Sequence, residues 1–184
     1  MDKKSLIRKK YFLRRKKNFF DINEKFFLPL INLIKKRGIS KKASISLYYP
    51  SSFELDVFKI LEVEYFKKFN FLLPIIQKNN SMEFYKWKQN EILYVNKYGI
   101  PEPKKTFKMI PSIILIPLLA FDKDKNRLGY GKGYYDKYLN KYIKSHKNIL
   151  TVGVAFSFQK YNKLPVNKKD FKLNFIITEK GIIK

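Results

Sequence analysis

The sequence has no cysteine, which excludes disulfide bonds and metal sites built on thiolates. Its single histidine, His146, lies in a lysine-rich segment, where we expect a surface residue and not a ligand. We find no Ser-His-Asp or zinc constellation in the chain. No apolar run approaches the roughly 20 residues that span a bilayer, and the N-terminus has no apolar signal core. These absences predict a cytoplasmic protein that does not contact a membrane.

Acidic residues are also scarce: 15 Asp and Glu stand against 40 Lys and Arg, a formal charge of +25. Charge of this size is typical of proteins that bind nucleic acid or another polyanion. The lysines, however, are spread over the whole length, and Asn, Ile, Phe and Tyr are abundant with them. The joint excess of Lys, Asn, Ile, Phe and Tyr indicates a drift in composition and not selection for nucleic-acid binding. We therefore expect no specific nucleic-acid partner, and a basic RNA-associated protein stays open as an alternative.

Hydrophobic residues make up 45% of the 184 residues, enough for a sizeable core, and no repeat or low-complexity linker divides the chain. Apolar runs typical of strands alternate with helical patterns. This alternation predicts an α/β fold, with one three-layer domain over residues 1–184, a largely parallel central sheet and basic N-terminal helices. Ligands in such folds bind beyond the carboxyl ends of the strands. The expected strands are 45–49, 70–76, 82–87, 113–119, 150–156 and 175–179.

Helical patterns lie between these runs. Residues 3–20 form a basic amphipathic pattern, and another pattern runs on to Phe66. Between them, Asp21 can cap a second helix and Gly38 can end it. Pro29 predicts a kink or a break inside that helix.

Residues 126–139 read NRLGYGKGYYDKYL and lie between an apolar run and a helical pattern. The alternating glycines Gly129, Gly131 and Gly133 allow positive φ angles and close approach of a ligand to the backbone amides. A glycine-rich turn that leads into a helix is a ready anion site, and Arg127 and Lys132 add positive charge. The spacing fits neither G-x-G-x-x-G nor a Walker A loop. An anion site and a merely structural turn with solvated charges both remain open.

The same stretch, together with Pro117-Leu118-Leu119-Ala120-Phe121-Asp122 before it, resembles the signature of 5-formyltetrahydrofolate cyclo-ligases. The resemblance extends over roughly residues 3 to 179. It implies ATP-dependent conversion of 5-formyltetrahydrofolate to 5,10-methenyltetrahydrofolate, with release of ADP and phosphate. The implied partners are a small-molecule folate, ATP and Mg²⁺, and we expect a monomer.

The resemblance also implies an ATP site. The family carries a Lys-x-x-x-Arg pair on its first helix, and Lys4 and Arg8 match that spacing. Residues four apart share a helix face, so both cations can reach one phosphate group. Arg127 and Lys132 are the expected catalytic residues, because phosphoryl transfer depends on charge neutralisation. The implied ATP contacts are Lys4, Arg8, Arg127, Gly129, Tyr130, Gly131, Lys132, Gly133, Tyr134 and Tyr135.

For the folate, the resemblance implies that Glu54 holds the pterin ring, and a carboxylate can accept two N–H donors from its edge. Trp87 is a second candidate, although a core position suits it equally, and Glu54 could instead serve a helix dipole. The remaining implied folate contacts are Gly131, Lys132, Gly133, Tyr134 and Tyr135. Asp136 and Asp170 are the implied metal ligands. Asp136 could alternatively stabilise the first turn of its helix.

Three positions depart from the family pattern. Val57 stands where the family has Thr, Lys169 replaces a frequent His, and Asn174 replaces a frequent Asp. These departures leave room for a diverged paralogue that keeps the fold and the nucleotide site without the folate chemistry. The segment Tyr98–Pro103, in contrast, resembles the family's proline-bounded loop near the substrate.

Overall fold

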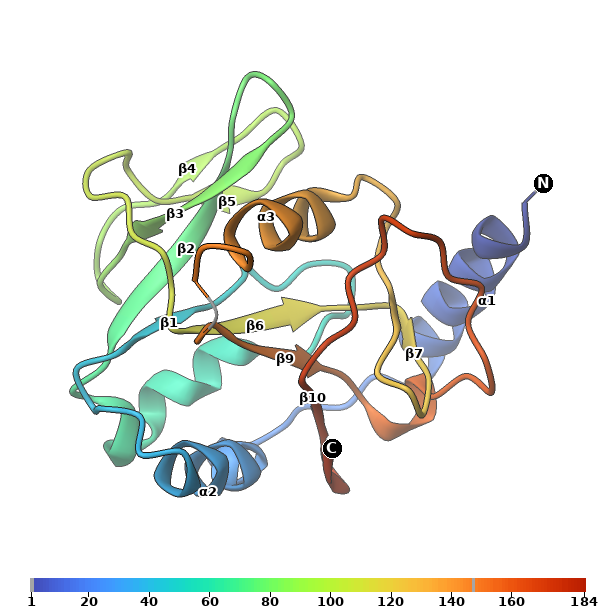
Figure 1. Cartoon of the computed structure of the whole chain (residues 1–184), viewed down its shortest axis with the longest axis horizontal. Helices are drawn as coiled ribbons and strands as arrows, with labels where there is room; N and C mark the ends of the chain where they lie inside the picture. Colours follow the sequence, from blue (N-terminus) through green and yellow to red (C-terminus); the bar gives the residue numbers. More distant parts are fainter. Residues whose placement is uncertain (1, 147) are drawn as a thin grey trace.

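A computed structural model describes residues 2–146 and 148–184. Its centre is a seven-stranded sheet in the order β11-β10-β9-β6-β1-β2-β3 (Figure 1). The five inner strands run parallel, and the two edge strands are antiparallel to their neighbours. The predicted α/β fold with a largely parallel sheet is confirmed. The strand bounds are β1 Ser44–Ser46, β2 Asn70–Ile76, β3 Met82–Lys86, β6 Ile113–Pro117, β9 Leu150–Val154, β10 Phe175–Thr178 and β11 Gly181–Ile183.

Helices cover both faces of this sheet, as expected for three layers (Figure 1). Side chains alternate along β6, so Ile113 and Leu115 enter one core and Ile114 and Ile116 enter the other. The first core contains α2 (Leu28–Lys36) and the 3₁₀ segments η1 (Glu24–Phe27), η2 (Val57–Glu62) and η3 (Glu64–Phe66). The second core contains α3, which spans Tyr134–Tyr142.

The first helix, α1 (Lys3–Asn18), lies beyond the tip of β6 in Figure 1. Asp2 caps it by accepting a hydrogen bond from the Ser5 amide at 2.7 Å. Its buried Ile7 and Tyr11 pack on the small hairpin of β7 (Ala120–Phe121) and β8 (Arg127–Leu128). This packing brings the basic helix against the glycine-rich turn that follows β8.

Several local predictions need correction. Asn23, and not Asp21, caps the second helical segment, because its side chain accepts from the Lys25 amide. The break predicted at Pro29, in contrast, is confirmed: the pattern splits into η1 and α2, and Pro29 lies at the start of α2, where the missing N–H is harmless. The segment up to Phe66 forms 3₁₀ turns and no α-helix. Short elements that sequence patterns did not predict include the β7–β8 hairpin, β4 (Tyr94–Val95), β5 (Pro101–Glu102), η4 (Ser157–Gln159) and the edge strand β11.

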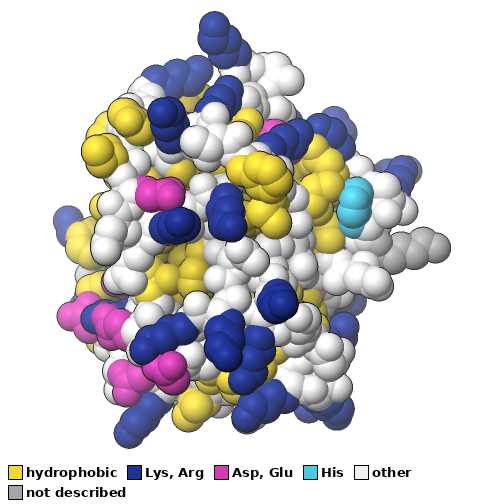
Figure 2. All heavy atoms as spheres, turned by 90° about the vertical axis from the view of Figure 1, so that its left-hand side faces the viewer, with side chains coloured by type: hydrophobic (Ala, Val, Ile, Leu, Met, Phe, Trp, Pro, Cys, Tyr) yellow, Lys and Arg dark blue, Asp and Glu magenta, His cyan; other side chains and the backbone are white. Residues whose placement is uncertain are grey.

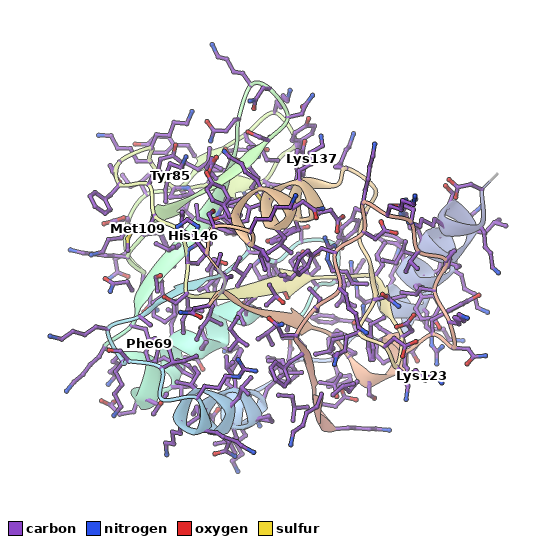
Figure 3. All side chains as sticks on the ribbon, in the orientation of Figure 1. Phe69, Tyr85, Met109, Lys123, Lys137 and His146 are labelled. Carbon is purple, nitrogen blue, oxygen red and sulfur yellow. The ribbon has the colours of Figure 1, made fainter. Side chains whose placement is uncertain are left out.

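Positive charge is distributed over the surface. Exposed lysines occur along the whole described chain, and Figure 3 labels two of them, Lys137 in the upper part of the view and Lys123 at the lower right. On the face drawn in Figure 2, basic groups are interspersed with apolar and neutral ones. The side chain of His146 is exposed, as predicted. None of the described helices is both long and apolar enough to cross a bilayer.

Candidate active site

A cavity of about 1120 Å³ opens beyond the carboxyl ends of the parallel strands. Its walls come from the segments after β1 and β8, the β4–β5 hairpin, α1 and the loop around Asp170. The position agrees with the general rule for open α/β sheets. The volume slightly exceeds the roughly 300–1,000 Å³ typical of single small-molecule sites. The cavity therefore has room for a ligand larger than one drug-sized molecule.

The structure brings together nearly all of the site residues that the sequence predicted. The lining includes Lys4, Arg8, Glu54, Arg127, Gly129, Tyr130, Gly131, Lys132, Gly133, Tyr134, Tyr135, Asp136 and Asp170. These residues come from segments up to 166 positions apart in the chain.

Trp87 is the exception, because its side chain does not line this cavity. Its buried ring packs on Phe58 with centroids 5.4 Å apart, and its Nε1–H donates to the Glu91 carbonyl at 3.3 Å. The folate contact predicted for Trp87 is therefore not supported, and the alternative of a core position describes it correctly.

The glycines of the turn make room for two arginines. Gly131 and Gly133 have φ angles of 99° and 69°, a region that strongly favours glycine. A Cβ on Gly131 would lie 3.3 Å from Cζ of Arg8, and one on Gly129 would lie 2.9 Å from Nη1 of Arg127. The alternating glycines thus let two guanidinium groups approach the backbone. Gly133 is also the left-handed residue that precedes α3.

The basic helix α1 is fastened to this turn. Arg8 donates from Nε to the Gly129 carbonyl at 2.9 Å, and its terminal nitrogens make no other hydrogen bond within the described residues. One turn earlier, Lys4 pairs with Asp170, whose same oxygen accepts from the Asn167 amide at 2.7 Å. Both cations line the cavity, as their four-residue spacing predicted.

Arg127 is held by Asp136. Its Nη2 lies 2.8 Å from Oδ1 of Asp136, and its side chain is only 4% exposed. The same carboxylate oxygen accepts from the Phe171 amide at 3.1 Å. The guanidinium also faces the Tyr135 ring at 5.7 Å, and its Nε–H is buried without a partner among the described residues. A buried donor without a partner is costly unless a ligand satisfies it.

Asp136 and Asp170 are two carboxylates of the cavity that could bind Mg²⁺. Each uses one oxygen for its hydrogen bonds, and the other oxygen has no hydrogen-bond partner in the described part of the chain. Mg²⁺ commonly takes one or two carboxylates and completes its octahedron with phosphates and water. Within residues 2–146 and 148–184, no three acidic or histidine side chains gather into a metal cage. Each of the two carboxylates therefore has one oxygen left that could serve as a single ligand of such an ion.

Glu54 sits in a tight turn after β1. Its side chain is 7% exposed, and Oε2 accepts from the Ser51 amide at 2.9 Å. Burial raises the pKa of Glu54, although the Ser51 amide and the Arg15 charge oppose this shift. Asp56 caps the following 3₁₀ segment, so Glu54 does not serve a helix N-terminus. The alternative of a helix-dipole role is not supported.

Three tyrosines surround Glu54. The Tyr48 hydroxyl donates to the Leu55 carbonyl at 2.9 Å, Tyr130 accepts from Arg15, and the hydroxyl of Tyr135 is buried without a partner among the described residues. Burial raises the pKa of each phenol, and the Glu54 charge raises it further. These hydroxyls therefore stay neutral at physiological pH and remain able to donate hydrogen bonds.

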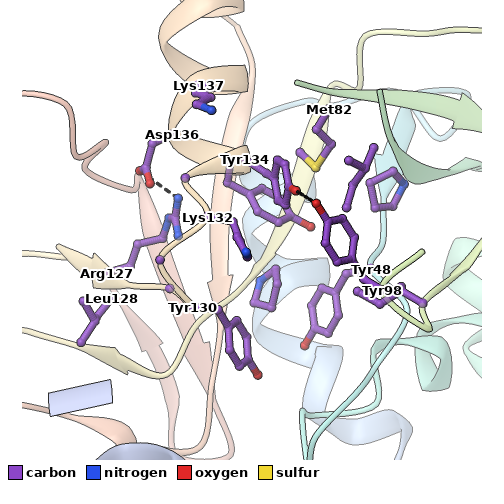
Figure 4. A pocket seen from close by; sticks show the side chains of 18 of the residues that line it. Tyr48, Met82, Tyr98, Arg127, Leu128, Tyr130, Lys132, Tyr134, Asp136 and Lys137 are labelled. Atoms are coloured by element: carbon purple, nitrogen blue, oxygen red, sulfur yellow. Dashed lines mark hydrogen bonds and ion pairs between the residues drawn. The ribbon is translucent and has the colours of Figure 1, made fainter. Parts of the chain in front are cut away.

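Figure 4 shows how these groups face one another. Arg127 and Asp136 lie on one side, Tyr48 and Tyr98 on the other, and Lys132 projects between them. Across the mouth, the hydroxyl of Tyr134 in α3 donates to that of Tyr98 at 3.2 Å. The β4–β5 hairpin thus meets the glycine turn over the cavity.

Sequence reasoning missed some of the site. Tyr48 and the hairpin residues Asn96 and Glu102 line the cavity, and Arg15 contacts its wall from behind. The resemblance did indicate the hairpin segment, and Tyr48 lies within the expected strand 45–49. No sequence signal distinguishes Arg15 from the other basic residues of α1.

Two of the three departures from the family pattern lie away from the cavity. Val57 is fully buried in the first core, and Asn174 accepts from the Thr151 amide and hydroxyl at 2.9 Å. Both positions therefore have structural explanations. Lys169 does line the cavity, and its backbone carbonyl accepts from Nδ2 of Asn140 at 3.0 Å.

Comparisons with known proteins agree with this picture. A model of the 5-formyltetrahydrofolate cyclo-ligase family matches residues 2–179. A probable 5-formyltetrahydrofolate cyclo-ligase of Schizosaccharomyces pombe is 31% identical over 140 residues, which cover 68% of this chain and 69% of that protein. The 5-formyltetrahydrofolate cyclo-ligase of Haemophilus influenzae is 29% identical over 150 residues, covering 78% of each.

Solved structures are similar over nearly the whole chain. The NMR structure of Aquifex aeolicus 5,10-methenyltetrahydrofolate synthetase matches with a TM-score of 0.75 at 32% identity, covering 98% of this chain and 92% of that one. A 5,10-methenyltetrahydrofolate synthetase from Mycoplasma pneumoniae matches with a TM-score of 0.67 at 25% identity, covering 96% and 98%.

Proposed function

The chain belongs to the 5-formyltetrahydrofolate cyclo-ligase family, and we propose that it closes 5-formyltetrahydrofolate to 5,10-methenyltetrahydrofolate while ATP becomes ADP and phosphate. One observation carries this proposal. A single cavity combines a cationic glycine turn, suited to phosphates, with the buried carboxylate of Glu54, suited to a heterocycle that offers N–H donors.

The chemistry requires such a combination. A formamide oxygen is a poor leaving group, so we propose that it first accepts the γ-phosphoryl group of ATP. The N10 nitrogen of the folate then attacks the formyl carbon, and the C–O bond breaks with release of phosphate. Phosphoryl transfer of this kind depends on positioning and charge neutralisation. The protein's task is therefore to hold two substrates together and to stabilise the charge that moves between them.

We propose that four basic residues neutralise that charge. Lys132 projects into the centre of the cavity, and the terminal nitrogens of Arg8 have no hydrogen-bond partner among the described residues (Figure 4). We propose that both contact phosphate oxygens together with the amides of the glycine turn, and that Lys4 assists from the same helix face. Arg127, fixed by Asp136, would donate to the transferring phosphoryl group through its buried nitrogens.

Mg²⁺ would supply further charge neutralisation and orientation of the nucleotide phosphates when bound. The free carboxylate oxygens of Asp136 and Asp170 are the protein groups we propose as its ligands. Asp136 then has two tasks, because its other oxygen positions Arg127.

On the opposite side of the cavity, we propose that Glu54 accepts two N–H groups of the pterin edge. The neutral Tyr135 hydroxyl, which is buried without a partner in the described part of the chain, is suited to donate to a carbonyl oxygen of the same substrate. The ring of Tyr135 packs on Arg127 while its hydroxyl lies near Glu54. Tyr135 thus connects the proposed nucleotide and folate sides.

The other assignments are also proposals. We infer a monomer in the cytoplasm without a specific nucleic-acid partner, since the basic side chains form no stripe on the face shown in Figure 2. A diverged paralogue is less well supported than the sequence suggested, because Val57 and Asn174 are explained by packing and by hydrogen bonds to Thr151.

The test is an activity assay with 5-formyltetrahydrofolate, ATP and Mg²⁺ that follows methenyl absorbance and released phosphate together. We expect one phosphate per methenyl product, and no product when either substrate is omitted. ATP binding without turnover would instead identify a diverged paralogue. Sequence-selective RNA binding that survives about 150 mM salt would favour the nucleic-acid alternative, because purely phosphate-driven affinity falls steeply with salt.

A further inference from the structure

Arg15, in the last turn of α1, is the only lysine or arginine among the described residues that is fully buried, with 1% of its surface exposed. It does not line the cavity. Its guanidinium donates to the carbonyls of Ser52 at 2.8 Å and Leu118 at 3.3 Å, and to the hydroxyl of Tyr130. One side chain therefore joins the end of β6, the turn after β1 and the glycine turn.

The burial of Arg15 is not explained by an ion pair. No described carboxylate lies within ion-pair distance of it, and its Nε–H has no hydrogen-bond partner there. Burying a charge without a partner of opposite sign is strongly unfavourable. The guanidinium is stabilised instead by the carbonyls of Ser52 and Leu118 and by the Tyr130 hydroxyl, so its burial depends on these three acceptors.

The turn that Arg15 holds is strained. Ser52 and Phe53 have φ angles of 50° and 63°, and consecutive non-glycine residues seldom adopt this left-handed region. Arg15 donates to Ser52, and the Phe53 ring packs against Phe19 and Lys16 just beyond Arg15. The C-terminal end of α1 thus contacts both strained residues. Glu54 follows them directly, so its direction depends on this conformation.

We propose that Arg15 is a positioning residue that holds the strained turn against Tyr130 from behind the cavity wall and so orients the Glu54 carboxylate toward the folate. This inference rests on the proposed function, which gives Glu54 the folate. It goes beyond that function because it makes folate affinity depend on a side chain that does not line the cavity.

Electrostatics supports the geometry. The titratable and charged groups that face Glu54 are Arg15 from α1, Tyr48 after β1, Tyr130 in the glycine turn and Tyr135 in α3. Arg15 is the only permanent charge among them, and it opposes the effect of burial on the pKa of Glu54. Without Arg15, that pKa would rise further, and protonated Glu54 would lose one of its acceptor positions.

The test measures 5-formyltetrahydrofolate binding by calorimetry, without ATP, across a range of pH for four proteins. Arg15→Met removes the charge and the donors at similar length, and Arg15→Lys keeps the charge without the planar fork. Arg14→Met is the matched control, because Arg14 is an exposed neighbour in the same turn of the helix. The wild-type protein is the reference.

We expect Arg15→Met to weaken folate binding about 10-fold or more, since a misdirected buried acceptor loses its hydrogen bonds. The pH below which folate binding weakens should be higher in Arg15→Met than in the wild type. In Arg15→Lys this pH should stay close to the wild-type value, although folate binding is still weakened. Arg14→Met should match the wild type in both respects. In separate kinetic assays, the KM for ATP should change less than the folate affinity in every variant, because two of the three groups that accept from Arg15, the carbonyls of Ser52 and Leu118, lie outside the glycine turn.

The outcomes separate this inference from the proposed function. If the wild-type protein does not bind the folate, the proposed function and the inference fall together. If wild type binds and Arg15→Met binds equally well with the same pH profile, only the positioning role falls, and a lower melting temperature would then show a purely structural arginine. If Arg15→Met does not fold, Arg15→Lys decides the question, and wild-type affinity in that variant would contradict the need for the fork.

Discussion

Two glutamates, Glu54 and Glu83, are buried to the same extent, each with 7% of its surface exposed, yet the protein treats them in opposite ways. Glu83, in β3, pairs with Lys141 and Lys108 and accepts from Tyr142 at 2.8 Å on both oxygens. Glu54 forms no ion pair with another described residue; it accepts from the amide and hydroxyl of Ser51, and a hydrogen bond with Tyr130 also acts on its pKa.

Their pKa values differ accordingly. Burial raises the pKa of both carboxyls, but the bonds from Lys141, Tyr142 and Lys108 outweigh burial at Glu83 and lower its pKa. At Glu54 burial prevails and the pKa is raised. A carboxylate that the protein satisfies serves the fold, whereas one left partly unsatisfied in a cavity is ready for a ligand.

The largest effect is expected when a cation of the glycine turn is replaced. We expect Arg127→Ala and Lys132→Ala each to lower kcat about 10²-fold or more, as when other transition-state donors are removed. Arg127→Lys should not restore the rate, because a point charge cannot reproduce a bidentate fork. The measurement is the cyclisation rate at saturating ATP.

The matched controls are lysines on the structural side. Lys141→Ala should lower thermal stability through Glu83 and leave kcat unchanged, and the exposed Lys144→Ala should change neither. Rates close to wild type for Arg127→Ala and Lys132→Ala would remove the glycine turn from the chemistry.

A smaller effect is expected at the backbone of the turn. Gly131→Ala forces a side chain into a φ of 99° and against Arg8, so it should destabilise the fold by about 1–3 kcal/mol. Because Arg8 must move, the KM for ATP should rise as well. Gly38→Ala is the control, since Gly38 also has a positive φ but open space around it. Equal KM values for ATP in both variants would show that Arg8 does not bind the nucleotide.

A matched pair of phenols sharpens the comparison further. Tyr142→Phe removes the bifurcated hydrogen bond from its hydroxyl to both oxygens of Glu83 and should lower stability by about 1–3 kcal/mol with no change in folate binding. Tyr130→Phe removes the acceptor of Arg15 beside Glu54, and should weaken folate binding several-fold with a smaller loss of stability. Thermal melts and folate titrations of both proteins give the result. If the two variants behave alike, the two carboxylate environments do not differ in function.

The smallest effect is the order of two acid transitions. The raised pKa means that ionised Glu54 destabilises the fold at neutral pH, and this penalty is lost as pH falls through that pKa. The lowered pKa of Glu83 means that its stabilisation is present above its ordinary value and is lost as pH falls through the folded value. Folate binding should therefore weaken at a higher pH than the one at which the Glu83 contribution disappears. Simultaneous loss of affinity and stability on acidification would contradict this order.

The sequence predicted the parts of the molecule that depend on neighbours in the chain. β2 has the predicted bounds, Asn70–Ile76, because a continuous apolar run specifies a buried parallel strand. Positive φ angles at Gly131 and Gly133 follow from the glycine pattern itself. The resemblance then predicted that Lys4, Arg8, Glu54 and the glycine turn share one site, and the structure places them in one cavity.

What sequence reasoning missed depends on distant contacts. Arg15 looks like any other cation of α1 until the fold places it beneath Ser52 and Tyr130. Trp87 could not be assigned to core or cavity, because a strand pattern does not say what lies above each face. Arg127 and Asp136 were predicted as site residues separately. The fold of the turn between them brings the two side chains together as an ion pair, which the sequence did not indicate.

The most direct measurement compares Glu54→Gln with Glu83→Gln by folate titration and thermal melting under the same conditions. Glu54→Gln should weaken folate binding about 10-fold or more, because a donor replaces one acceptor, while its melting temperature stays the same or rises. Glu83→Gln should bind folate like the wild type and melt several degrees lower, roughly 2–4 °C for each kcal/mol lost. This crossed pattern is what the account predicts. If Glu54→Gln binds folate as well as Glu83→Gln does, the buried carboxylate in the cavity does not bind the substrate, and the role proposed for Glu54 is wrong.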